Sequence, residues 1–376
     1  MYGCVLLLFV LRLGSLNAFE AHYRWRERKR AWAVFLEQSP PSADTLGYAL
    51  VRFDCETLRK EIHRVYTILQ RNHLIRQLRI QGWLIIGLDG HELFSSYLRC
   101  CDQCCTRRVQ TAQGEKIQYY HRIVVAQLLG GPFAIPLDLE PIRPGEDEVA
   151  AGSRLMKRLL RHYPKAFDVV SADGLYGRTG FVHLVTSHSK HLLFVLKENN
   201  SDLLEDAKGL FTHQAPHLKQ EGRNLYQRWD EEGFDPWPET KRLFRIVRSF
   251  ETKSKGKQSL ISDWYWCMTL PKAIVSTETV CHIGHKRWEI ENQGFNILVN
   301  YYNLDHCFKH HPNAIVAFAL ICCLAYILFQ MFYYRNLKRP LPHRGSLQFV
   351  THTLLESLEE MLQCRLCLFY PLLKPG

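Results

Sequence analysis

The sequence lacks the even set of cysteines that a secreted, disulfide-stabilised protein has. It holds 13 cysteines in 376 residues, and a chain of this length can bury a large core without disulfides. An odd number of cysteines spread over such a length indicates thiols in a reducing compartment. We therefore expect a globular cytoplasmic protein.

A leader in its usual form is also missing. Residues 1–15 are apolar, but no basic residue comes before the apolar run, and the first one, Arg12, follows it. A signal peptide has its positive charge ahead of its apolar part. We expect this segment to be a helix of the folded protein.

The chain is short of acidic residues. Its 37 aspartates and glutamates stand against 48 lysines and arginines, for a net charge of +11. Such a balance suits a polyanion, because lysine and arginine contacts to phosphates release counterions; a merely basic soluble protein explains the charge equally well. Aromatic side chains among the basic residues favour nucleic acid, since bases stack on them. The basic runs are 24–30, 71–79, 154–161 and 241–248, and the aromatic residues are Trp25, Phe244, Trp264 and Trp266.

Two short apolar runs both stop at an Asp-Gly pair, at Asp89 and at Asp173. Each run has the length of a buried strand, and its aspartate then stands at the strand's carboxyl end, where open α/β sheets collect ligands. An Asp-Gly pair is also a common hairpin turn, which is the simpler explanation for either one alone. The repetition indicates a shared site.

A third acid lies in the stretch 287–300. If this stretch is one helix, Glu291 falls on an apolar face and points inward. Two explanations stay open: a salt bridge to Arg287, four residues earlier, or a metal ion shared with the two aspartates. Three carboxylates form the kind of oxygen-rich set that holds Mg²⁺ or Mn²⁺ for phosphoryl chemistry. The apolar residues of that face are Trp288, Phe295 and Leu298.

The order strand-aspartate, strand-aspartate, helix-glutamate resembles the DDE transposases of bacterial insertion sequences. With Arg-Trp-x-Ile-Glu at residues 287–291, the chain is most similar to the group that carries a Tyr-x2-Arg-x3-Glu-x6-Lys signature. The resemblance implies an α/β fold with a ribonuclease-H-like mixed sheet flanked by helices. It runs from about residue 42 to about residue 335 and includes the segments 89–96, 119–122, 173–177 and 191–197.

The resemblance also implies an activity: cutting DNA at the terminal inverted repeats of an insertion sequence and joining the 3′-OH to target DNA. Asp89, Asp173 and Glu291 would be the catalytic residues and would hold Mg²⁺ or Mn²⁺ for two-metal phosphoryl transfer. Such proteins act as homodimers on paired ends, in the bacterial cytoplasm with the nucleoid. Two alternatives stay open: an inactive or degenerate transposase-derived DNA-binding protein, and a structure-specific nuclease on the same core.

The candidate DNA contacts lie around the third acid and in a basic run, 251–259, which we expect to be a hairpin loop. Arg287 would donate to a phosphate or else hold Glu291 in place. The other candidates are Trp288, Asn292, Lys253, Lys255 and Lys257.

Three features depart from the family pattern. Gly284 stands where the signature has Tyr, and Leu298 stands where it has Lys, so contacts to the transposon end are expected to differ. Residues 1–15 are similar to a helix found further inside such proteins, and we expect a shortened N-terminal portion.

Cysteines and histidines form two smaller groups. Cys101 and Cys104 have the C-x2-C spacing of a zinc site, to which His121 could contribute. One such pair without a second pair is weak, so we favour buried or free thiols. A second pair, Cys364 and Cys367, lies near the end of the chain. The histidines of the segment 301–314, including His310, are expected in a solvated loop.

The run 314–334 is long and apolar enough to span a bilayer. A helix that is apolar all round also occurs in the core of a large soluble protein. Because it closely follows the Glu291 stretch, we favour a buried core helix and expect no membrane.

The remaining pattern predicts the domain organisation. Helical spacing fills most of the first part, and three strand-like runs rich in aromatic and β-branched residues, 224–233, 242–250 and 262–270, predict a β-rich insertion in which Trp264 and Trp266 pack in the core. A helix over 146–163 has Asp147 and Glu148 in its first turn, where they complement the helix dipole. The expected regions are a helical region 1–81, a first core part 82–200, the insertion 201–272, a last core part 273–335 with the Glu helix and the apolar helix, and a C-terminal tail 336–376.

Overall fold

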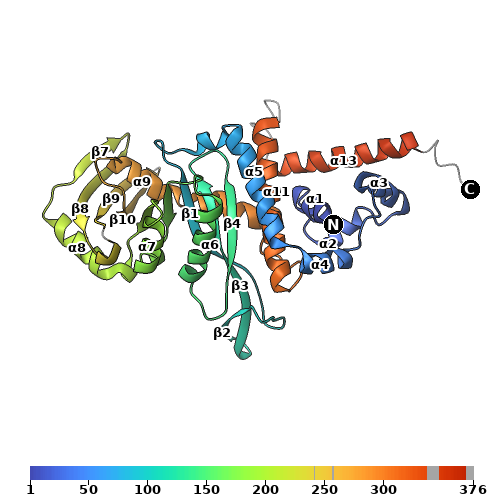
Figure 1. The fold of residues 1–376 in the computed structure, drawn as a ribbon, viewed down its shortest axis with the longest axis horizontal. Coiled ribbons are helices and arrows are strands. Elements are labelled where there is room, and N and C mark those ends of the chain that lie inside the picture. The colour runs from blue at the N-terminus through green and yellow to red at the C-terminus, as the bar shows by residue number, and fades with distance from the viewer. Residues whose placement is uncertain (241, 256–257, 337–346, 370–376) are drawn as a thin grey trace, which may run out of the picture. The chain divides into compact units, whose positions relative to one another are not determined.

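The computed structural model describes residues 1–240, 242–255, 258–336 and 347–369 (Figure 1). The chain forms two compact units whose segments alternate along the sequence. We call them the sheet unit, which comprises Val65–His91 and Ile123–Gly294, and the helical unit, which comprises Met1–Arg64, Glu92–Arg122 and Phe295–Gly376.

The sheet unit is built on a mixed β-sheet in which the strands from β3 onward have the order β3-β1-β5-β6-β10-β9-β8-β7, and β4 also pairs with β3. Helices α6 (Glu148–His162) and α7 (Thr179–Thr186) pack on β4 and β6, respectively, and against each other. A mixed sheet flanked by helices is the ribonuclease-H-like class that the resemblance implies, and that prediction is confirmed. The strands are β1 (Ile85–Ser96), β3 (Gly114–Leu129), β4 (Ile135–Ile142), β5 (Val169–Ala172), β6 (His191–Val195), β7 (His217–Glu221), β8 (Asn224–Phe234), β9 (Phe244–Lys255) and β10 (Gln258–Met268).

Strands β1, β5 and β6 run parallel to one another. All four residues of β5 are buried, as are Ile85 to Leu88 of β1, because strands in the middle of a covered sheet bury both faces. The strand before Asp173 ends where the sequence predicts. The strand before Asp89 does not, since β1 continues to Ser96 and Asp89 lies within it.

The predicted β-rich insertion is confirmed by β8, β9 and β10, which pair antiparallel in sequence. Strand β10 also pairs with β6, so the insertion extends the core sheet. The expected loop over 251–259 is mostly strand, because Glu251 to Lys255 of β9 pair with Gln258 to Ser262 of β10. Helices α8 (Ser201–Thr212) and α9 (Thr277–Lys286) complete this part, and α9 packs on β6, β9 and β10.

The stretch 287–300 is not one α-helix. After α9 comes η5 (Ile290–Phe295), a π-helical turn, and then α10 (Asn296–Tyr302). A π-turn holds extra residues compared with an α-helical turn and rotates the face that follows it. The predicted inward orientation of Glu291 is therefore wrong: Glu291 is exposed, and its neighbour Ile290 is buried.

The helical unit is organised around α11 (Pro312–Met331), which contacts α1 (Tyr2–Val10), α4 (Ala43–Arg52) and α10. Ser42 caps α4 by accepting a hydrogen bond from the Thr45 amide. Other elements of the first part are α2 (Leu16–Ala21), α3 (Arg26–Leu36), α5 (Cys55–Arg71) and η1 (Leu74–Leu78); η6 (Phe332–Asn336) follows α11, and α13 (Leu347–Phe369) contacts α3. The predicted helical first part is thus confirmed.

Helix α11 is the element whose composition also fits a membrane span. Among the described residues, Pro312–Arg335 is the one helical stretch long and apolar enough, and most of its apolar window is buried within the protein. Residues from Ala314 to Gln330 pack inward on several sides of the helix. The prediction of a buried core helix is confirmed.

The helical unit also contains a β-hairpin. Strand β2 (Cys105–Thr111) pairs antiparallel with the first half of β3, from Cys105 opposite Tyr120 to Thr111 opposite Gly114. The turn before β2 contains Cys101 and Cys104, where the Cys104 amide donates to the Cys101 carbonyl at 3.2 Å.

Candidate active site

The parallel pairing of β1 and β5 brings the two predicted aspartates together. Ile85 is opposite Val169 and Gly87 is opposite Ser171, so the same register, continued by two residues, sets Asp89 beside Asp173. Neighbouring strands lie about 4.8 Å apart. The two carboxylates interact electrostatically, since Asp173 raises the pKa of Asp89.

Asp89 is a carboxyl whose negative charge is poorly compensated. Burial raises its pKa to about 6, and Glu148 and Asp173 add to the increase. Arg287 and the Gly90 amide, which donates to Oδ1 at 3.0 Å, only partly oppose it. The site therefore favours additional positive charge next to Asp89.

Asp173 is better compensated. It caps the short helix η2 (Gly174–Tyr176), and the Gly174 amide donates to its Oδ1 at 2.6 Å. The Lys197 ammonium lies 2.8 Å from Oδ1 and donates to Oδ2 at 3.0 Å. Burial raises the pKa of Asp173, but Lys197, Gly174 and Arg287 together hold it below its ordinary value. Asp173 is thus a carboxylate at neutral pH.

Arg287 lies directly after α9 and contacts Asp89, although it is far from Asp89 in the sequence. Its Nη1 donates to Oδ2 of Asp89 at 3.2 Å, and the residue is 7% exposed. Its Nε is buried and has no hydrogen-bond partner in the described part of the chain. The salt bridge to Glu291 that the spacing allows is not formed among these residues, because Arg287 is turned to Asp89 instead.

Glu291 is the acid that the structure does not bring to the pair. It lies on the exposed π-turn η5, four residues after Arg287, and its side chain makes no hydrogen bond or ion pair within the described residues. Two of the predicted acids are therefore adjacent, and the third is on a neighbouring segment with a free carboxylate.

Glu148 is a carboxylate near the site that the sequence analysis assigned only to the helix dipole. It is 8% exposed, accepts a hydrogen bond from the Tyr176 hydroxyl at 3.3 Å and raises the pKa of Asp89. Asp147 performs the expected role, capping α6 through the Ala150 amide at 2.9 Å. An acid in a first helical turn looks the same in sequence whether it caps or lines a site, so only the burial distinguishes them.

The donor set suits a hard divalent cation. Asp89 and Asp173 offer carboxylate oxygens, the ligands that Mg²⁺ and Mn²⁺ prefer, and Glu148 adds negative charge near Asp89. Burial keeps the pKa of Asp89 high, the charges of Glu148 and Asp173 raise it further, and a bound cation would oppose all three effects. Arg287 and Lys197 supply that positive charge in the structure. The residues present therefore fit such an ion.

The departure at Gly284 has a structural counterpart. A Cβ at this position would lie 2.4 Å from the Trp266 ring, which is 1% exposed. Trp266 stacks on Trp264 at 6.1 Å and lies edge-on to His285 at 5.1 Å. The indole of Trp266 fills the space next to residue 284, and the expected core packing of Trp266 is confirmed. Leu298, at the other departure, is 1% exposed.

The other candidate DNA contacts are partly accessible. Trp288 is 42% exposed and lies under the Arg287 guanidinium at 5.1 Å, and Asn292 is exposed. Lys253 forms an ion pair with Glu251 at 2.5 Å. Lys257 and the side chain of Lys255 lie outside the described residues.

A comparison with protein families identifies the family of the chain. The family model described as a transposase DDE domain matches residues 106–328, more than half of the chain, and this range includes Asp173, Arg287 and Glu291 but starts after Asp89. No individually curated protein matches the chain. The match agrees with the mixed sheet and with the paired aspartates at the edge of its parallel strands, and the chain belongs to the transposases with a DDE domain.

Proposed function

We propose that this protein cuts DNA at the ends of an insertion sequence and joins the freed 3′-OH to target DNA. The observation that carries the proposal is the pair of aspartates, Asp89 and Asp173, set side by side on parallel strands with Arg287 against them. Family membership supports DNA as the partner and a divalent metal as the cofactor.

Asp89, Asp173 and Glu291 would hold Mg²⁺ or Mn²⁺. When bound, two such ions supply a hydroxide nucleophile and stabilise the leaving 3′ oxygen. The exposed, unpaired carboxylate of Glu291 is free to contribute to such a site. Glu148 would favour metal binding by adding negative charge near Asp89.

Arg287 binds and orients the DNA backbone in this proposal. Its buried Nε has no partner among the described residues, so the guanidinium retains a donor for a phosphate oxygen while Nη1 holds Asp89. Trp288, beside it, exposes an aromatic face on which a base can stack. Lys197 keeps Asp173 ionised and fixes its orientation.

Action on paired ends as a homodimer, and association with the bacterial nucleoid, belong to the same proposal. A homodimer can hold two ends at once, and the DNA on which the protein acts lies in the nucleoid.

A second candidate is a degenerate copy that binds DNA without cutting it. It is favoured by the burial of Leu298, which stands where the signature carries a lysine. A structure-specific nuclease is the third candidate, because the same aspartate pair can cut without joining.

One experiment separates the three. A labelled fragment carrying the gene's own flanks is incubated with a target plasmid, Mg²⁺ or Mn²⁺, and native protein or Asp173→Asn. We expect cleavage at the flanking repeats and labelled ends covalently joined to the plasmid, with both products absent for Asp173→Asn. Cleavage without joining would identify a nuclease, and tight binding without cleavage would identify a degenerate copy.

A further inference from the structure

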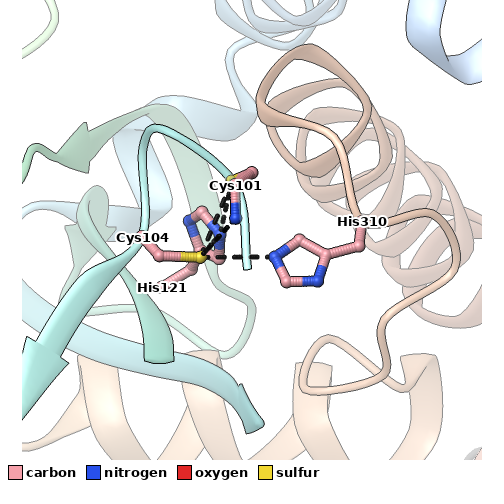
Figure 2. Close-up of side chains that lie close together, drawn as sticks. All are labelled: Cys101, Cys104, His121 and His310. Carbon is pink, nitrogen blue, oxygen red and sulfur yellow. Dashed lines mark hydrogen bonds between the residues drawn. The ribbon is translucent and has the colours of Figure 1, made fainter. Parts of the chain in front are cut away.

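A second cluster of metal-binding side chains lies in the helical unit, away from the aspartate pair in sequence and in chemistry. The thiols of Cys101 and Cys104 and the imidazoles of His121 and His310 each direct one ligand atom to a common centre, and the four ligand atoms lie within 4.8 Å of one another (Figure 2). All four residues belong to the helical unit.

Four of the distances between these atoms are close to the edges of a tetrahedron around a metal ion. The Cys101 and Cys104 sulfurs are 3.6 Å apart, and Nε2 of His121 lies 3.4 Å from the first and 3.2 Å from the second. Nε2 of His310 lies 3.3 Å from the Cys104 sulfur. In ideal tetrahedral Zn²⁺ coordination, with Zn–S of about 2.3 Å and Zn–N of about 2.05 Å, the two sulfurs are about 3.8 Å apart. A sulfur and a nitrogen are then about 3.6 Å apart.

The local fold explains how the first three ligands meet. The turn over Cys101 and Cys104 is closed by the Cys104 amide, and the Cys101 amide donates to the Cys104 sulfur at 3.3 Å. Because Cys105 pairs with Tyr120 across the hairpin, the preceding Cys104 lies next to His121. An N–H bond to sulfur stabilises a thiolate, which is the form that binds metal.

The fourth ligand arrives from far along the chain. His310 lies in the connector between α10 and α11, 206 positions from Cys104, and its ring lies edge-on to His121 at 5.4 Å and to Phe94 at 5.8 Å. Hydrogen bonds alone account poorly for four such atoms at one centre, since a thiol is a weak donor.

We propose that Cys101, Cys104, His121 and His310 bind one Zn²⁺ in a closed, structural site that ties the α10–α11 connector to the β2–β3 hairpin. Two thiolates and two imidazoles are a common structural zinc set, and they select a soft ion over Mg²⁺. Four protein ligands leave no open position for a substrate, so the ion stabilises the helical unit and takes no part in DNA cleavage.

The test uses the full chain, purified in reductant and without a metal-affinity step. Elemental analysis of the native protein is expected to find about one zinc per chain. The variants Cys104→Ser and His310→Asn lose it, whereas Cys100→Ser, an exposed neighbour, and Cys307→Ser, whose thiol lies near Cys101, retain it. Asp173→Asn also retains it, which distinguishes this ion from a catalytic metal.

Because a ligand variant can fail to fold, the native protein is also exchanged with Co²⁺. The expected result is the intense visible absorption of tetrahedral cobalt together with thiolate-to-metal charge-transfer bands. Native reduced protein with neither zinc nor this spectrum overturns the proposal. So does zinc that persists unchanged in both Cys104→Ser and His310→Asn, or a metal-free chain in which Cys101 and Cys104 form a disulfide.

Discussion

The aspartate pair of the sheet unit and the cysteine–histidine cluster of the helical unit are two sites built on opposite principles. Around Asp89 and Asp173, basic side chains balance the acids, and one acid keeps a raised pKa. Around Cys104, two cysteine sulfurs and two imidazoles lie close together, and none of these four ligands is a carboxylate. The first arrangement suits a metal ion and a polyanion that bind and dissociate, and the second suits a permanently bound metal ion.

The largest expected effect is on the aspartate pair. Asp89→Asn removes a carboxylate from the proposed metal set while keeping its shape, and we expect cleavage of an insertion-sequence end to fall by at least about 1,000-fold. The measurement is the single-turnover rate on a labelled end. Asp206→Asn, an exposed acid of α8 in the same unit, is the matched control and should cut normally. Equal rates for Asp89→Asn and the control would remove Asp89 from the mechanism.

Metal removal separates the two sites. Dialysis into metal-free buffer should abolish cleavage, because carboxylate and water ligands hold Mg²⁺ weakly, and millimolar Mg²⁺ should restore it fully. The zinc content should stay at about one per chain throughout, since closed tetrahedral thiolate sites retain their ion. Joint measurement of activity and elemental content checks both. If zinc alone restored cleavage, the two sites would not differ in the metal that they use.

Glu251 is a buried carboxylate in the sheet unit with the opposite balance from Asp89. Burial raises its pKa, but His285 at 2.6 Å and Lys253 at 2.5 Å outweigh this and lower the pKa to about 2. A depressed pKa stabilises the folded state above the ordinary value of 4.5, and that stability is lost as the pH falls towards 2.

We therefore expect Glu251→Gln to lower the free energy of unfolding by about 3 kcal/mol at pH 7 and to flatten the loss of stability between about pH 4.5 and pH 2. Urea unfolding at pH 7 and at pH 3 measures both effects. Glu239→Gln, at an exposed position, should change neither. If the stability of Glu251→Gln depends on pH below 4.5 as that of the native protein does, the pKa of Glu251 is not lowered, and Glu251 does not differ from Asp89 in this way.

The smallest expected effect concerns Gly284, where the signature has a larger residue. Gly284→Ala places a Cβ 2.4 Å from the Trp266 ring, and we expect a loss of about 2 kcal/mol in unfolding free energy from overpacking. Gly209→Ala in α8 meets nothing within 4 Å and should be neutral or stabilising by up to about 1 kcal/mol. If both variants behave alike in urea unfolding, Trp266 does not fill the space of the missing side chain.

The parts of both sites that sequence analysis could predict are those carried by local pattern. A short apolar run that stops at Asp-Gly marks Asp89 and Asp173, although β1 runs past Asp89 to Ser96. The buried character of α11 also follows from composition and position.

The features that could not be predicted from the sequence depend on three-dimensional packing, which the spacing of residues along the chain does not reveal. A regular helical period predicts that Glu291 points inward, but the π-turn at Ile290–Phe295 breaks that period. Glu148 has the same first-turn position as a capping acid, and only packing buries it near Asp89. Local pattern places His310 in a solvated loop, because its partner, Cys104, is 206 positions away and leaves no local signal.

The claim that most needs a direct test is that Asp173 contacts the metal that drives cleavage. In Asp173→Cys a soft sulfur replaces a hard oxygen, and Mn²⁺ accepts sulfur more readily than Mg²⁺ does. The account predicts that this variant fails to cut an insertion-sequence end with Mg²⁺ and regains cleavage with Mn²⁺, whereas the native protein cuts with either. Cleavage by Asp173→Cys in Mg²⁺ at the native rate would contradict it.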